Sequence, residues 1–260
     1  MSDPVSTGGF FRVEGFRLRV WPLLVVILLG VGIHFLSSVA VDAAEHFAGL
    51  PERPEMPWVA FAYGHVAQLV LALVAIGIVK PFVRADFGLH GADGKSYLGA
   101  ALFWGLLFAV LIAAVDYWPQ ILSHKHPTDR PYPLTALNVA GWLSYQGILA
   151  GPSDEIFLRG LLVTFLAANL PGRIGLWRYE MNVAGVLVAA MVALTHVVDF
   201  FTKSGLTALG ELVLSFLFGV LLAYWFEKSR SLWASIAGHS VEAMAKIAIV
   251  FAMVAVWHYA

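Results

Sequence analysis

Nine ionisable side chains lie within or beside the last four apolar segments of the sequence, where a charge is costly. They are Asp154, Glu155, Arg159, His196, Asp199, Glu211, His239, Glu242 and Lys246. A charged side chain at the centre of a bilayer costs on the order of 3 kcal/mol, so each needs a partner, a hydrated cavity or a function. The three earlier apolar segments hold only His34 and His65. The chemistry is therefore expected in the C-terminal half.

Two adjacent acids and an arginine form the densest charged group. Glu155 and Arg159 are four residues apart with the acid first, the favourable order for an ion pair on a helix. Asp154 lies about 100° around the helix from Glu155 and has Leu158 four residues on, so its carboxylate could face a cavity. A helix restarted after Pro152 would also explain both acids, because exposed backbone donors favour anions there.

Two histidines in separate segments could work with this carboxylate. His196, His239 and Asp154 could bind and deprotonate a water molecule for attack on a carbonyl. The same groups could bind a metal, but they are scattered over three segments without HExxH spacing, so the spacing does not support zinc. No other cofactor is expected.

The remaining polar residues are interpreted as structural. We expect His34 and His65 to be hydrogen-bonded core histidines, and Asp199 and Glu211 to be interfacial or network residues. Glu242 and Lys246, four residues apart, are expected to form a structural ion pair. Serine and aspartyl mechanisms lack support, because neither GxSxG nor GxGD is present, and the sequence has no cysteine.

Composition places these residues in a membrane. Of 260 residues, 60% are hydrophobic and 13% charged, and the mean hydropathy is +0.79, which excludes a soluble monomer. A formal charge of −1 offers no basic surface for nucleic acid. We expect an all-α polytopic bundle of about seven to eight transmembrane helices, because an uninterrupted helix pairs its backbone within the bilayer. The expected spans are 21–41, 58–79, 97–115, 138–170 with an interruption at Gly151-Pro152, 183–201, 206–226 and 232–257.

The distribution of cations predicts orientation. One set of loops holds ten Lys and Arg residues and the alternate set four, so the N-terminus is expected in the cytoplasm. The expected membrane is a bacterial inner membrane. The expected organisation is an interfacial segment at 1–20, three N-terminal spans with their loops at 21–137, and a catalytic bundle at 138–257. The first span is expected to be retained rather than cleaved as a signal peptide.

The order of these residues resembles the CPBP membrane proteases, which include type II CAAX prenyl endopeptidases and bacteriocin-processing enzymes. The sequence DEIFLRG at 154–160 corresponds to the family's Glu-Glu-x-x-x-Arg followed by Gly, and VALTH at 192–196 to Phe-x-x-x-His. Phe218-Gly219 and the turn RSLW at 230–233, leading to His239, match the later fragments. The likeness spans about residues 140 to 245.

The resemblance implies a glutamate-type intramembrane peptidase without metal. By position, Asp154 and His196 would activate water, and His239 would stabilise the tetrahedral intermediate. Glu155 and Arg159 would support them.

Three positions depart from the family pattern. Asp154 is one methylene shorter than Glu, and a displacement of about 1 Å can cost on the order of 100-fold in rate. Ala243 stands where the family has Asn or Asp, and Val192 replaces Phe. An active enzyme is expected, although these departures weigh against it.

The expected function is hydrolysis of a peptide bond in a membrane-associated protein or peptide within the lipid bilayer. The alternative is a catalytically impaired relative that binds a membrane peptide as an immunity or chaperone-like factor, motivated by Asp154 and Ala243. Proton-coupled transport would use similar buried groups, but the sequence lacks the internal repeat that many transporters show.

Overall fold

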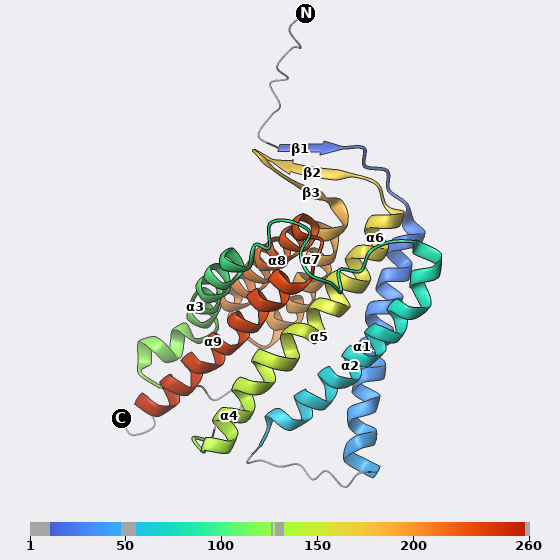
Figure 1. Cartoon of the computed structure of the whole chain (residues 1–260). Coiled ribbons are helices and arrows are strands. Elements are labelled where there is room, and N and C mark those ends of the chain that lie inside the picture. The colour runs from blue at the N-terminus through green and yellow to red at the C-terminus, as the bar shows by residue number, and fades with distance from the viewer. Residues whose placement is uncertain (1–10, 48–55, 126, 128–132, 258–260) are drawn as a thin grey trace, which may run out of the picture.

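The computed structural model describes residues 11–47, 56–125, 127 and 133–257, and shows a helical bundle with a small sheet at one end (Figure 1). Within these residues, six helices are long and apolar enough to cross a membrane. They are α1 (Val20–Phe47), α2 (Trp58–Val83), α3 (Leu98–Ser123), α7 (Val183–Thr195) with its 3₁₀ extension η3 (His196–Phe201), α8 (Gly205–Ser229) and α9 (Trp233–Trp257). The chain is a multi-pass integral membrane protein, and the expected all-α bundle is confirmed.

A further helical run, which we call the motif helix, carries the predicted acidic motif. It comprises α4 (Ala136–Ser144), the π-helix η1 (Tyr145–Ala150), α5 (Gly151–Glu155), the π-helix η2 (Ile156–Val163) and α6 (Thr164–Asn169). The run continues through Gly151-Pro152, so the interruption expected there is a change from π-helix η1 to α-helix α5 and not a gap between two helices. Pro152 stands in the first turn after η1, where the change from π to α bonding disturbs the regular ladder and tolerates the missing N–H.

A three-stranded antiparallel sheet covers one end of the bundle. Strand β1 (Phe11–Glu14) pairs with β2 (Arg173–Leu176), which pairs with β3 (Tyr179–Asn182). Arg173 contacts both Glu180 and Glu227, which ties the sheet to α8. An interfacial segment was expected at 1–20; residues 1–10 lie outside the described residues, and 11–14 form this strand.

Small residues allow α9 to approach its neighbours closely. A side chain at Gly105 of α3 would place its Cβ 2.5 Å from the carbonyl oxygen of Gly238, and one at Gly151 would lie 2.2 Å from Ser240 Oγ. Membrane helices commonly pack through such small residues. These approaches hold α9 against both α3 and the motif helix. Residues of all three line the site described below.

Candidate active site

The acidic motif lies on a short α-helical stretch between two π-helical turns. Segment α5 presents Asp154 and Glu155, and the following turn η2 presents Arg159. Thr164 Oγ1 donates to the Arg159 carbonyl oxygen at 3.2 Å, within this wider turn. π-helical turns occur often at functional sites, because the extra residue re-aims nearby side chains. Here the two neighbouring acids face different surroundings.

Glu155 faces a closed, buried cluster. Its side chain has no exposed surface, and its Oε1 lies 2.8 Å from Arg159 Nη1 and 2.8 Å from His239 Nδ1. Arg159 also donates through Nη2 to the Gly219 carbonyl oxygen of α8 at 3.0 Å. The expected Glu155–Arg159 pair is present, and it joins the motif helix to α8 and α9.

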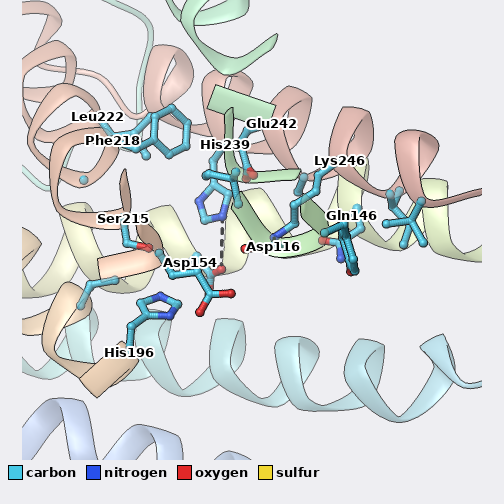
Figure 2. A pocket seen from close by; sticks show the side chains of 18 of the residues that line it. Asp116, Gln146, Asp154, His196, Ser215, Phe218, Leu222, His239, Glu242 and Lys246 are labelled. Carbon is cyan, nitrogen blue, oxygen red and sulfur yellow. Dashed lines mark ion pairs between the residues drawn. The ribbon is translucent and has the colours of Figure 1, made fainter. Parts of the chain in front are cut away.

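Asp154 faces an open space instead. Its Oδ1 accepts a hydrogen bond from Gln68 Nε2 at 2.7 Å and lies 3.7 Å from His65 Nε2. Its Oδ2 lies 3.6 Å from His239 Nε2. In Figure 2 the Asp154 carboxylate and the ring of His239 point toward one another across the pocket. Asp154 is thus the exposed member of the acid pair.

Helix α2 contributes polar residues that the sequence interpretation did not assign to the site. His65 Nδ1 lies 2.9 Å from the Phe61 carbonyl oxygen and 3.1 Å from the Tyr145 hydroxyl, while Ser153 Oγ donates to the His65 carbonyl oxygen. The interpretation of His65 as a hydrogen-bonded core residue is therefore incomplete. One signal was available: His65 and Gln68 are three apart, and such residues share a helix face.

His196 reaches the pocket from the end of α7. There the chain tightens into the 3₁₀ turn η3, in which residues three apart are eclipsed, so Asp199 stands beside His196. His196 Nδ1 lies 3.0 Å from Asp199 Oδ2. Lys203 Nζ donates to both Glu211 oxygens at 2.7 and 2.8 Å and lies 3.6 Å from Asp199 Oδ1. Asp199 and Glu211 are network residues, as expected.

A cavity of about 820 Å³ connects these groups. Asp154, His196 and His239 all line it. Polar side chains of α3, η1, α8 and α9 line it as well, among them Glu211 and, labelled in Figure 2, Asp116, Gln146, Ser215, Glu242 and Lys246. The sequence-predicted trio therefore shares one space.

The expected Glu242–Lys246 ion pair is wrong: both residues line the cavity, but no ion pair joins them. Lys246 Nζ lies 3.8 Å from Asp116 Oδ2 instead. Glu242 Oε1 is buried without a hydrogen-bond partner among the described residues. Helical spacing predicted a shared face, but an acid on α3 competes for the ammonium group.

Residues 136–245 match the family model for type II CAAX prenyl endopeptidases of the Rce1-like kind. The chain carries an Rce1-like domain. This match supports the CPBP and CAAX protease membership that the motifs indicated, and the family implies intramembrane protease activity. No curated protein and no solved structure is significantly similar to the chain.

The Rce1-like domain contains the motif helix, both predicted histidines and Ala243, whereas His65 and Gln68 lie outside it on α2. Ala243 lines the cavity on α9, one turn beyond His239. A methyl group cannot donate a hydrogen bond there, so His239 is the donor that α9 offers next to Asp154.

One group in the Rce1-like domain has a spacing that a metal ion could use. His196, Asp199 and Glu211 each offer a ligand atom within 4.8 Å of the others. Lys203 already contacts both carboxylates and supplies positive charge between them. Burial alone would lower the pKa of the Lys203 ammonium, but its hydrogen bonds to Glu211 raise that pKa overall, so the group is charged at neutral pH. This set differs from the Asp154, His196 and His239 set considered from sequence.

Proposed function

We propose that the chain is an intramembrane endopeptidase that hydrolyses a peptide bond of a membrane-associated protein or peptide with a water molecule activated by a carboxylate and histidine. The observation that supports this most is the shared cavity of Asp154, His196 and His239. The Rce1-like domain supplies independent support for a protease. No step of the proposed reaction requires a metal ion.

Asp154, rather than Glu155, is the proposed base. Asp154 lines the cavity, and Gln68 holds its Oδ1 at 2.7 Å. Glu155 is fully buried and already binds Arg159 and His239, so it cannot reach a water molecule in the cavity without breaking those contacts. Glu155 is therefore a positioning residue that acts through His239.

The two histidines take different parts. His196, oriented by Asp199 through Nδ1, presents Nε2 for proton transfer with Asp154. As water attacks the carbonyl carbon, its proton passes to Asp154 or His196, and the carbonyl oxygen becomes negatively charged. His239 stabilises that oxygen, because Glu155 fixes its Nδ1 and leaves Nε2 toward the cavity. The C–N bond then breaks, and the proton is delivered to the leaving amine.

The proposed setting is a bacterial inner membrane with the N-terminus in the cytoplasm. The ten cations of the more basic loop set lie in the sheet or near the helix ends on the sheet side: Arg12, Arg17, Arg19, Lys80, Arg84, Lys95, Arg173, Arg178, Lys228 and Arg230. Cytoplasmic flanks carry the excess of Lys and Arg. Nothing in the cavity requires a prenyl group on the substrate, and no nucleic acid is involved.

The test replaces Asp154 by Asn, which keeps the shape of the side chain and removes its charge. Membrane proteins cut in cells carrying the intact chain are compared with those in cells carrying Asp154→Asn. Loss of the general base is expected to lower cleavage about 10²- to 10⁴-fold. Asp42→Asn, on an exposed part of α1, is the matched control and should cleave normally.

Two results would contradict this proposal. Inhibition by a chelator with rescue by zinc would favour metal chemistry. Identical membrane-protein profiles for the intact chain and Asp154→Asn, with one peptide co-purifying with both, would favour the catalytically impaired peptide-binding alternative suggested by Asp154 and Ala243.

A further inference from the structure

The catalytic cavity is closed toward the sheet. At that end α3, α8 and α9 meet through side chains with almost no exposed surface: Ala101, Leu222, Trp225 and Ala234 are 0–2% exposed. The close approach of Gly105 and Gly238 lies in the same region. The sheet β1–β2–β3 lies beyond this layer (Figure 1). A peptide has no passage through this packing.

The cavity extends in the opposite direction. On α3 its lining starts at Ile112 and continues to Gln120, toward the C-terminal end of that helix. On α9 it runs from His239 to Val250, away from the sheet. On α8 it starts at Thr207, close to the N-terminal end. Because α3 and α9 both begin at the sheet end and α8 ends there, these three stretches lead to the same end of the bundle (Figure 1).

Hydrophilic and exposed residues form the cavity rim at that end. Lys203 and Ser204, in the connection between η3 and α8, line the cavity and are exposed, and Pro119 of α3 is exposed beside them. The Lys203 side chain is 42% exposed. This rim is opposite to the ten cations that assign the sheet side to the cytoplasm.

We propose that the catalytic cavity receives its peptide from the non-cytoplasmic side of the membrane. The substrate would then be an extended segment of an exported or membrane-anchored protein at the outer face, rather than the tail of a cytoplasmic protein. The identity of the peptide as a substrate rests on the proposed function. The direction of access depends only on the packing of the helices and the distribution of charges.

The chain has no cysteine, so single cysteines can report access directly. Thr202→Cys marks the rim, and Arg178→Cys marks the sheet hairpin; both positions are exposed. A membrane-impermeant sulfonated maleimide is applied to spheroplasts and to inverted membrane vesicles containing the full chain. We expect Thr202→Cys to react in spheroplasts and Arg178→Cys only in inverted vesicles. The reverse pattern would overturn the assignment of sides.

Cysteines on α8 then test the cavity itself. Ser215 lines the cavity, whereas Ser229 on the same helix is fully buried at the sheet end, so Ser215→Cys and Ser229→Cys are matched variants. The probe is a small trimethylammonium methanethiosulfonate. Ser215→Cys should react in spheroplasts at least about tenfold faster than in inverted vesicles, and Ser229→Cys should stay unreacted in both. The same rate from both sides, faster reaction in inverted vesicles, or no reaction of Ser215→Cys in spheroplasts would overturn the proposal.

These labelling results do not depend on catalysis. If Asp154→Asn leaves cleavage unchanged, the proposed function fails while the direction of access can still hold. If the labelling pattern is reversed, the direction fails while the peptidase can still hold. The two failures are therefore distinguishable.

Discussion

Two histidine–carboxylate pairs flank Asp154, and they differ in their surroundings. His239 Nδ1 lies 2.8 Å from Glu155, whose side chain is fully buried, and the adjoining cation Arg159 is 4% exposed. His196 Nδ1 lies 3.0 Å from Asp199, and the adjoining cation Lys203 is 42% exposed. The same pairing thus occurs once inside the packed bundle and once at the cavity rim.

Because of this difference, the buried pair is held rigidly, whereas the pair at the rim can exchange protons with water. In the buried pair, few water molecules screen the charges, so the geometry of His239 is fixed but the loss of one partner leaves an uncompensated charge. In the rim pair, water shares the stabilisation of the charges, so single losses are tolerated and protons can leave. This difference supports the proposed roles, in which the first pair stabilises charge and the second transfers protons.

The largest expected effect comes from breaking the buried pair. Arg159→Ala leaves Glu155 charged and buried, and we expect the free energy of unfolding to fall by about 3–5 kcal/mol. Thermal unfolding in detergent measures the change. Arg178→Ala, at an exposed hairpin position, is the control and should change stability by less than about 0.5 kcal/mol. Similar losses for both variants would show that the two environments do not differ as described.

A smaller effect is expected from the rim pair, on activity rather than stability. Asp199→Asn can donate to His196 Nδ1 and so favour the wrong tautomer, which should lower kcat by at least about tenfold with KM unchanged. Cleavage of a substrate identified in the Asp154 experiment provides the rate. Asp199→Glu, which keeps the acceptor, should recover part of it. A fall in unfolding temperature with kcat intact would instead indicate a purely structural residue.

The smallest effect is expected for Lys203→Met. This variant removes the cation from Glu211 and Asp199, but the lysine side chain is substantially exposed, so the loss should stay near 1 kcal/mol or below. The hydrogen-bonded lysine has a raised pKa, so its contribution, while the partner carboxylates are ionised, is complete below the ordinary lysine pKa of about 10.4 and is lost as the pH rises through the raised value. Unfolding of intact chain and variant at low and high salt tests this. A fall in the free energy of unfolding as large as that of Arg159→Ala would show that the rim pair is not screened by water as described.

Much of the bundle was predictable because a helix that spans the lipid bilayer needs a continuous apolar segment. Apolar runs of about 20 residues mark spanning helices, and α2, α8 and α9 begin within a residue or two of the expected positions. The pairing of Glu155 with Arg159 followed from four-residue spacing. The likeness to the family was also visible in the sequence, because the family's fragments keep a fixed order along the Rce1-like domain.

Contacts between distant segments were not predictable in this way. The position of His65 beside Asp154 depends on how α2 packs against α5, and no local pattern encodes that. Lys246 binds Asp116 rather than Glu242 because α3 and α9 approach closely. Pro152 suggested a break, since a local rule does not report a preceding π-turn.

The pairing of β1 with β2 has a consequence for biogenesis. Phe11 pairs with Leu176, so the ribosome must synthesise more than 160 further residues before the partner strand exists. At about 5–20 residues per second, that takes on the order of 10–30 s, during which helices α1, α2, α3 and the motif helix enter the membrane. In the proposed orientation, β1 therefore stays unpaired on the cytoplasmic side, and the sheet can close only after α1, α2, α3 and the motif helix have been synthesised.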